Sequence, residues 1–311
     1  MACFATSYSL PIRYTNNVYH QAELVYAMLA GALPTPPDDI IWGAPPISAW
    51  ARSMLQLMLP GARVHESINA SEAVGCRVFN EAPSAGIYFR SAKTAKEIRA
   101  HALKQCGLAD RQADIVTPLV VFMPRAAASS VQSAGRRNFV RRREIVEQLR
   151  MLNGSRVKVV PSPSASMPIC EQISVWAMAD AIATPNGAHF VNAPFLPRGA
   201  VLVEGVPWSM RHYVGQLRIT QHFSTRHLRA HSSRPPPSPL LGRFSAVGSE
   251  QECEVNQACQ HAYRDRANLH VEPQAIIAAL SPLLNCRDDD DWQNPWPVGS
   301  ARAACKTAAH S

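Results

Sequence analysis

The sequence lacks several features that define whole classes of protein. Only 15 of its 311 residues are glycine, which excludes a collagen-like repeat. Its eight cysteines are too few for a disulfide scaffold and include no C-x-x-C pair, so we expect neither a structural zinc site nor a thioredoxin-like redox centre. Charged residues make up 17% and hydrophobic residues 47%, which excludes disorder over most of the chain. One large domain or two ordinary ones fit this length.

Long apolar runs are also missing. The longest, at residues 24–33, is about half of the ~20 residues that a membrane-spanning helix needs. The first ten residues lack the basic flank and apolar core of a signal peptide, so we expect no signal or transmembrane segment in this chain. Cys253 and Cys259 are close enough in sequence for a local disulfide, which requires an oxidising compartment.

Basic residues exceed acidic ones, 31 to 23, which gives a net charge of +8. This excess favours anionic partners such as phosphates, nucleic acid or a membrane surface. Five arginines at positions 136, 137 and 141–143 make nucleic-acid binding one hypothesis. No basic strand with interleaved aromatic residues and no nucleic-acid module accompanies them, so we expect no nucleic-acid partner.

Strands alternate with helices from residue 118 onward. Apolar runs predict strands at 119–123, 157–160, 181–184 and 200–204. A helix with Ile145 and Leu149 on one face follows the first strand, and a helix bearing Ile173 and Trp176, with Ser166 as its cap, follows the second. This alternation predicts right-handed crossovers and a doubly wound parallel sheet. The segment before residue 115 is also α/β, with helices around 22–29, 49–59 and 92–105, and one helix at 273–284 follows the proline-rich loop at 232–239.

Ligands of an open parallel sheet bind beyond the carboxyl ends of its strands, so the loops after the predicted strands are candidate sites. The loop of Asn186, Gly187 and Ala188 joins a strand end to a helix start, where backbone amides can hold an anion. Alternatively, this loop is an ordinary strand-to-helix turn without a ligand. Arg125 follows the strand at 119–123, and its guanidinium, like that of Arg137, suits diphosphate oxygens. The arginines at 141–143 fit a solvated surface better.

A series of residues in one order carries a resemblance to a known family. It comprises Asn138, Arg143-Glu144, Glu171-Gln172, Ala179-Asp180-Ala181, Pro185-Asn186-Gly187-Ala188, Asn192, Phe195, Pro197, Gly199 and Val203-Glu204, with Asn17-Val18-Tyr19-His20 upstream. The series resembles the catalytic domain of glycosyltransferase family 61, which contains plant xylosyl- and arabinosyltransferases and animal extracellular O-GlcNAc transferases. The resemblance covers residues 15–215, and its downstream half is the more specific.

The resemblance implies an α/β architecture of two Rossmann-like domains, the GT-B type, with the doubly wound sheet in the C-terminal half. An acceptor-side domain is expected at 15–115 and a nucleotide-sugar domain at 116–231. A proline-rich loop and a C-terminal helix that returns toward the first domain are expected at 232–285, and a disordered tail at 286–311.

The implied activity is inverting, metal-independent transfer of a sugar (xylose, arabinose or N-acetylglucosamine) from a nucleotide sugar, a UDP-sugar, to a glycan or protein acceptor. No cofactor and no metal site are expected. His20 is the candidate base that takes the acceptor proton, although a structural role is the alternative for a single histidine. Glu204 is the candidate ligand of the donor ribose, and Asn192 joins the donor site. Glu144, Glu171 and Gln172 are expected behind the residues that touch the donor.

One departure from the family pattern concerns the donor loop. Where the family has Pro-His-Gly-Ala, this sequence has Asn186, which forms hydrogen bonds but cannot become cationic. Losing a charged donor there raises the barrier by about 2–4 kcal/mol, unless His189 points back into the cleft. A catalytically impaired relative that binds nucleotide or glycan without turnover is therefore the alternative. The resemblance to the family also implies that the protein is located in the lumen of the Golgi or the endoplasmic reticulum.

Overall fold

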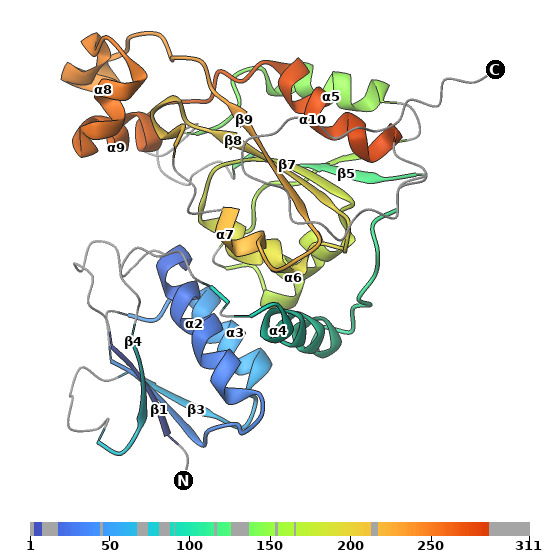
Figure 1. The fold of residues 1–311 in the computed structure, drawn as a ribbon, viewed down its shortest axis with the longest axis vertical. Helices are drawn as coiled ribbons and strands as arrows, with labels where there is room; N and C mark the ends of the chain where they lie inside the picture. Colours follow the sequence, from blue (N-terminus) through green and yellow to red (C-terminus); the bar gives the residue numbers. More distant parts are fainter. Residues whose placement is uncertain are drawn as a thin grey trace.

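The computed structural model describes residues 3–7, 18–43, 46–66, 74–80, 88–89, 91–114, 117–125, 137–152, 155–164, 166–212 and 217–285. The predicted disordered tail at 286–311, Asn17 and Arg136 lie outside these residues. In the described part, the chain forms two parallel sheets, one in each half of the sequence, separated by a layer of helices (Figure 1). The architecture is therefore α/β and Rossmann-like, as predicted.

The first sheet contains β1 (Cys3–Ser7), β2 (Asp39–Trp42), β3 (Arg63–Glu66) and β4 (Arg77–Asn80). Its order is β3-β2-β1-β4, and all described pairs are parallel. Helices α2 (Val18–Ala32), α3 (Ala49–Met58) and α4 (Ala92–Gln105) lie between this sheet and the second one (Figure 1). All three were predicted from sequence, and Met54, Leu55 and Met58 of α3 are buried, so this methionine stripe is core.

The second sheet contains β5 (Leu119–Phe122), β6 (Arg156–Val159), β7 (Ala181–Pro185), β8 (Val201–Val206) and β9 (Arg226–His231). Its order is β6-β5-β7-β8-β9, again with parallel pairing throughout the described strands. The first four strands confirm the sequence prediction. β9 was not predicted, because its sequence, RHLRAH, is too polar to be recognised as a buried strand.

Two faces of the second sheet carry different cores. Val120, Ala183 and Val203 point to one face, where α5 (Arg142–Met151) and α10 (Pro273–Asn285) cover them. Their sequence neighbours Val121, Ile182 and Leu202 point to the other face, toward α6 (Ile169–Met178) and the 3-10 helix η2 (Ala188–Phe195). This second core continues without interruption into α2, α3 and α4, so the two halves share one apolar interior.

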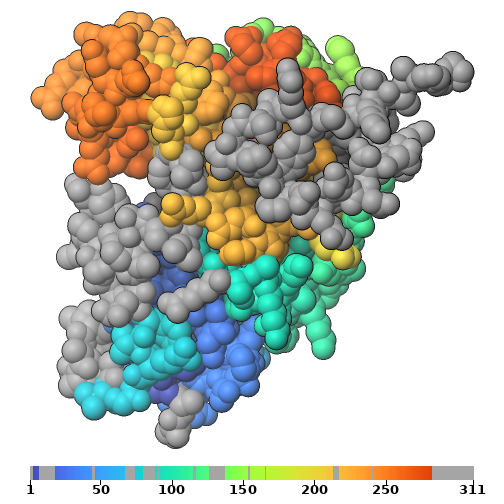
Figure 2. All heavy atoms as spheres, viewed as in Figure 1, coloured from blue at the N-terminus to red at the C-terminus, as the bar shows by residue number. Residues whose placement is uncertain are grey.

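Direct contacts fasten the two halves to each other. Cys106, the C-cap of α4, forms a disulfide with Cys170 of α6. Tyr26 on α2 donates a hydrogen bond of 2.7 Å to the carbonyl of Val191 on η2. The buried Asp180 carboxylate anchors the connecting segment by accepting hydrogen bonds from the Arg111 side chain (2.5 Å) and from the backbone N–H groups of Asp114 (2.9 Å) and Leu119 (2.7 Å). The space-filling view shows the two halves packed directly on each other (Figure 2).

The start of α6 differs from the prediction. Pro168 is the N-cap residue and makes no side-chain capping bond, so Ser166 does not cap this helix. Ser166 lies two residues before the N-cap, and its hydroxyl instead pairs with that of Ser164 at 2.9 Å. A second disulfide, which like that of Cys106 and Cys170 was not predicted, joins Cys3 and Cys76 beside the pairing of β1 with β4.

The C-terminal segment holds more helices than the single one predicted. η4 (Pro239–Ala246), α8 (Glu250–Val255) and α9 (Gln257–Arg266) precede α10. These three helices are short and therefore show no long apolar periodicity from which they could be predicted. The expectation that the C-terminal helix returns toward the first half is wrong: α10 packs on α5, β8 and β9, because Ile276 and Leu280 fill the core of that outer face (Figure 1).

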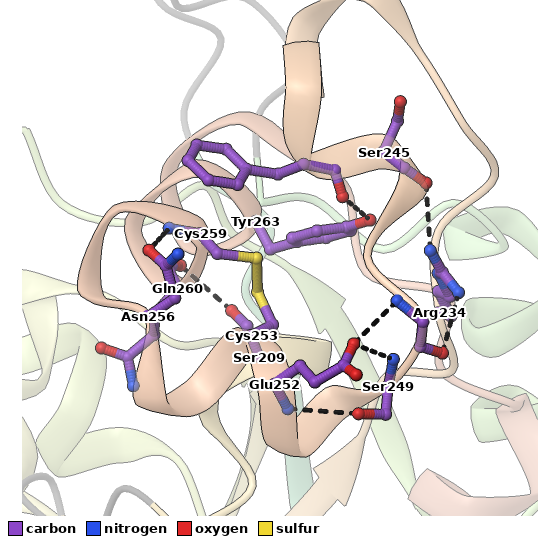
Figure 3. The surroundings of a disulfide bond; sticks show 12 residues. Ser209, Arg234, Ser245, Ser249, Glu252, Cys253, Asn256, Cys259, Gln260 and Tyr263 are labelled. Carbon is purple, nitrogen blue, oxygen red and sulfur yellow. Dashed lines mark hydrogen bonds between the residues drawn. A yellow bond between two sulfur atoms is a disulfide. The ribbon is translucent and has the colours of Figure 1, made fainter.

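Short polar caps and one disulfide hold α8 and α9 together (Figure 3). The predicted Cys253–Cys259 disulfide is present and links the two helices. Ser249 and Glu252 form a capping box at the start of α8, in which the serine hydroxyl accepts from the Glu252 N–H at 3.2 Å. Tyr263 on α9 donates to the carbonyl of Phe244 at 3.2 Å. The pair therefore has a small apolar core of its own, which also includes Trp208 from the segment after β8.

Two other helices complete the described part of the second half: the 3-10 helix η3 (Trp208–Met210) after β8, and the short α7 (Leu217–Thr220) before β9. A membrane-spanning helix would need a longer apolar stretch than any described helix offers.

Candidate functional site

The strand order of the second sheet reverses between β5 and β7. From β5 the chain passes through α5 to β6 on one side, then through α6 to β7 on the other side. Because these two crossovers cover opposite faces, a crevice forms beyond the carboxyl ends of β5 and β7, the usual ligand site of such sheets. Arg125 lies just after β5, and Asn186, Gly187 and Ala188 follow β7 directly. The topology therefore brings the predicted arginine and the predicted loop to one edge.

Gly187 lies at the closest approach between these two segments. Its φ of 178° is extended backbone that any residue adopts, so strain does not require glycine here. Contact does, because a Cβ on Gly187 would lie 2.8 Å from Cε1 and Nδ1 of His189. The same point is 3.6 Å from Nη1 of Arg125. The His189 ring thus packs against the bare backbone of Gly187, close to Arg125, and leaves no room for a side chain at this position.

Two partly buried arginines line this edge. The Arg125 backbone N–H donates to Asn138 Oδ1 at 2.8 Å, and its buried Nη1 has no hydrogen-bond partner in the described part of the chain. The Arg137 N–H donates to the carbonyl of Ala267 at 3.0 Å, and its backbone is left-handed, with φ of 57°. Burial lowers the pKa of Arg125, and burial together with the charge of Arg125 lowers the pKa of Arg137 to about 10.

Both guanidinium groups stay charged at neutral pH and have little compensation. The nearest carboxylate is Asp265 at the end of α9, whose Oδ1 lies 3.7 Å from Nη2 of Arg137. Asp265 also pairs with Arg264 at 2.8 Å. Although burial raises the pKa of Asp265, its arginine neighbours outweigh that effect and lower it overall. Desolvated positive charges are costly without partners, so the edge is suited to an added anion.

His189 is a neutral imidazole at the same edge. The hydroxyl of Thr184 donates to the carbonyl of Met123 at 2.9 Å, which uses its only proton. Nε2 of His189, 2.8 Å from that hydroxyl oxygen, is therefore the donor of their hydrogen bond. Burial, and then the charges of Arg125 and Arg137, lower the pKa of His189 to about 3. His189 thus points back toward the loop, yet it carries no charge that would replace the one Asn186 lacks.

Asn186 is buried and faces inward. Its backbone N–H donates to the carbonyl of Gly205 at 2.8 Å, and its side-chain amide donates to Glu204 Oε1 at 2.5 Å. The other Glu204 oxygen lies 3.2 Å from Nε2 of His227 and 3.8 Å from Nε of Arg229. Glu204 is only 2% exposed, so its carboxylate holds Asn186 and His227 in place rather than facing open space.

Asn192 and Gln172 connect the halves. Asn192 on η2 is fully buried and accepts a hydrogen bond of 3.0 Å from the indole of Trp50 on α3. Its amide donates to Gln172 Oε1 at 3.4 Å, and Gln172 in turn donates to the carbonyl of Met167 at 2.8 Å. These two residues therefore fix η2 between α3 and α6, and the described contacts of Arg125 and His189 do not include them.

The structure places Glu144 and Glu171 elsewhere. Glu144 is on the surface of α5, paired with Arg141 at 2.6 Å, and so lies on the outer face of the sheet. Arg143 pairs with Glu147 in the same way, which confirms the surface interpretation of these arginines. Glu171 is exposed and lines a groove of about 420 Å³ beside the disulfide of Cys106.

His20 belongs to the other half of the molecule, in the first turn of α2. Its Nδ1 lies 3.8 Å from Oε2 of Glu23, one turn later, and Glu23 is only 7% exposed. Tyr26 of the same helix contacts η2, about 9 Å further along the helix axis. The beginning of α2 therefore lies near the junction of the halves, but no described contact joins His20 to the arginines.

Several residues of this edge escaped the sequence analysis. Thr184 was not considered as a site residue, whereas His189 was named only as a histidine that could point back into the cleft. Three others come from elements far away along the chain: His227 and Arg229 from β9, and Asp265 from α9. Nothing in their local sequence indicates that they belong to this edge. Within the described residues, no group of three His, Cys, Asp or Glu side chains is placed to hold a metal ion.

The comparisons with known proteins agree with the geometry. A search of curated proteins finds no match to this chain. The family model described as Glycosyltransferase 61 matches residues 49–203, about half of the chain. The match runs from α3 to β8 and so includes Arg125, Arg137 and the loop at Asn186. The chain therefore belongs to glycosyltransferase family 61.

Proposed function

We propose that this protein is an inverting, metal-independent glycosyltransferase. It moves a sugar (xylose, arabinose or N-acetylglucosamine) from a UDP-sugar to a glycan or protein acceptor. The diphosphate of the donor binds at the carboxyl ends of β5 and β7. One observation carries this proposal: Arg125 lies within contact distance of the Gly187 turn, beside a second partly buried arginine with little compensating charge.

The chemistry follows from where charge develops. When the bond between the sugar and the diphosphate breaks, negative charge accumulates on the leaving diphosphate. Arg125 and Arg137 neutralise this charge, and the start of η2, the positive end of its dipole, lies at the same edge. No metal is required for this step.

Inversion needs a base on the opposite side of the sugar. His20 takes the proton of the acceptor hydroxyl as that oxygen attacks the sugar carbon. Glu23 lies one turn later on α2, with its Oε2 3.8 Å from Nδ1 of this imidazole. The base comes from the first half of the chain and the leaving-group ligands come from the second, so the reaction occurs between the two.

Such a division corresponds to the GT-B architecture, with an acceptor-side domain at 15–115 and a donor domain at 116–231. Two parallel sheets facing a shared layer of helices support it. Three disulfides in the described residues support folding in an oxidising compartment, such as the lumen of the endoplasmic reticulum or Golgi.

A second candidate function is nucleotide or glycan binding without turnover. Asn186 favours it, since it replaces the family histidine and donates its amide to Glu204 rather than toward the crevice. The neutral state of His189 also favours it. In that case the fold and the diphosphate site are retained, and the protein acts as a binding partner of the donor or the acceptor.

The test is release of free nucleoside diphosphate from a panel of UDP- and GDP-sugars with glycan and peptide acceptors. We expect turnover that Arg125→Gln abolishes and Arg143→Gln leaves unchanged, because Arg143 is 92% exposed and pairs with Glu147. The Asn186→His variant is measured beside the original chain. Thermal stabilisation by UDP but no turnover in either would favour the binding protein, and neither stabilisation nor turnover would refute both functions.

A further inference from the structure

His189 has one nitrogen committed and one available. Nε2–H donates to Thr184, whose own proton is held by the carbonyl of Met123. Nδ1 therefore carries a lone pair, and it makes no hydrogen bond in the described part of the chain. It lies 2.8 Å from the point where a Cβ of Gly187 would be, on the same side as Arg125. Nδ1, an acceptor, and the guanidinium of Arg125, a cation, therefore both lie close to the Gly187 backbone.

The charges around the ring explain why it is neutral. Arg125, from the end of β5, and Arg137, from the segment before α5, both disfavour the imidazolium. Asp265 on α9 acts mainly on the arginines. Glu204 is enclosed behind Asn186. Trp176 of α6, with its ring centre 6.1 Å from that of His189, contributes no charge.

An anion bound beside Arg125 and Gly187 would favour the protonated form of His189. A diphosphate cancels much of the positive charge of the two arginines and adds its own attraction for a proton. Opposite charges within about 4–6 Å raise the pKa of a cationic group by 1–3 units. The free nitrogen Nδ1 faces the incoming oxygen atoms, so the new proton would lie between the ring and the anion.

We propose that His189 takes up a proton at Nδ1 when a diphosphate binds beside Gly187, and then donates it in a hydrogen bond to a diphosphate oxygen. The proton comes from solvent, Nε2–H remains bound to Thr184, and no covalent bond changes. His189 thereby becomes a second cation for the leaving group only when the donor is present. This inference rests on the proposed diphosphate site but names a residue and an event that the site alone does not require.

The experiment follows the histidine ring directly. The full chain is labelled with 15N in its histidines, and its NMR signals are titrated from pH 4.5 to 8 with and without inorganic pyrophosphate. His189→Phe assigns the signal, and His101→Phe, an α4 residue whose ring contacts Gln105, is the control. We expect a neutral ring protonated on Nε2 over the whole range without ligand. With pyrophosphate we expect the titration midpoint to rise by about 2–3 pH units into the measured range.

Calorimetry in buffers of different ionisation enthalpy gives the second readout. At pH 5.5, pyrophosphate binding should take up more protons in the original chain and in His101→Phe than in His189→Phe. Loss of the charged hydrogen bond should weaken binding in His189→Phe by about 10–100-fold. Pyrophosphate that binds while the ring stays neutral would overturn this inference and leave the proposed function intact. Absence of binding by both pyrophosphate and UDP would overturn the proposed function itself.

Discussion

Replacing Gly187 with alanine tests the geometry of the donor edge most directly. The added methyl would lie 2.8 Å from the His189 ring, whereas carbon atoms in contact are normally about 3.5–4.0 Å apart. The ring would have to move by several tenths of an ångström and would lose its hydrogen bond to Thr184. Overpacking costs about 1–3 kcal/mol and a hydrogen bond about 1 kcal/mol. We expect the free energy of unfolding to fall by about 2–4 kcal/mol.

Two further variants isolate the cause. Gly61→Ala is the matched control, because a Cβ there meets nothing within 4 Å and its φ is not positive, so we expect no loss of stability. The double variant Gly187→Ala/His189→Ala removes the obstacle, and the new methyl then occupies space that the ring has left. The destabilisation of the double variant should therefore be smaller than the sum of the two single effects.

Chemical denaturation gives the free energies, and calorimetry with inorganic pyrophosphate gives the accompanying loss of binding, which we expect to be at least about tenfold, since the methyl also enters the space beside Arg125. If Gly187→Ala were as stable as Gly61→Ala and bound pyrophosphate normally, His189 would not lie against the loop. The account of the donor edge given above would then be refuted.

Other predictions concern charge, pH and the disulfide between the halves. Arg137→Gln removes one of the positive charges that lower the pKa of His189, so NMR titration should show that pKa rising above about 3; an unchanged value would place Arg137 outside the site. Below pH 6.5 His189 is protonated in the unfolded chain, whereas in the folded protein it is protonated only near pH 3. The free energy of unfolding should therefore decrease as the pH is lowered from 6.5 to 3. His189→Phe should lessen that slope by up to about 1.4 kcal/mol per pH unit in urea titrations at successive pH values, and identical slopes would contradict the neutral ring. Replacing Cys106 and Cys170 together with serine should lower the free energy of unfolding by about 2–4 kcal/mol in denaturant without reductant, and no loss would show that this disulfide does not join the halves. Glu204→Gln should cost about 1–3 kcal/mol by the same measurement, because a neutral amide accepts a weaker hydrogen bond from Asn186 than the carboxylate does and no longer neutralises Arg229, and an unchanged stability would mean that these contacts are not made.

Local patterns were sufficient to predict the first four strands of the second sheet and the helices of the first half. Apolar runs such as 119–122 and 201–206 are buried on both faces, and in such strands hydrophobicity is nearly continuous and easily recognised. β9 and the pair α8–α9 were missed because a polar edge strand and a disulfide-linked pair of short helices carry no such periodicity.

The sequence by itself determined that Gly187 and Arg125 follow strand ends, and therefore that they meet at one edge of a parallel sheet. It also determined, through the family's residue order, the kind of chemistry to expect. Only the tertiary structure decided the partners and charge states of the site. Glu204 was expected to face the donor, but its carboxylate is enclosed by Asn186 and His227. His189 is neutral because two arginines and burial act on it together. Charge and hydrogen bonding depend on distances through space, and residues such as Asp265 reach this edge only when the whole chain has folded.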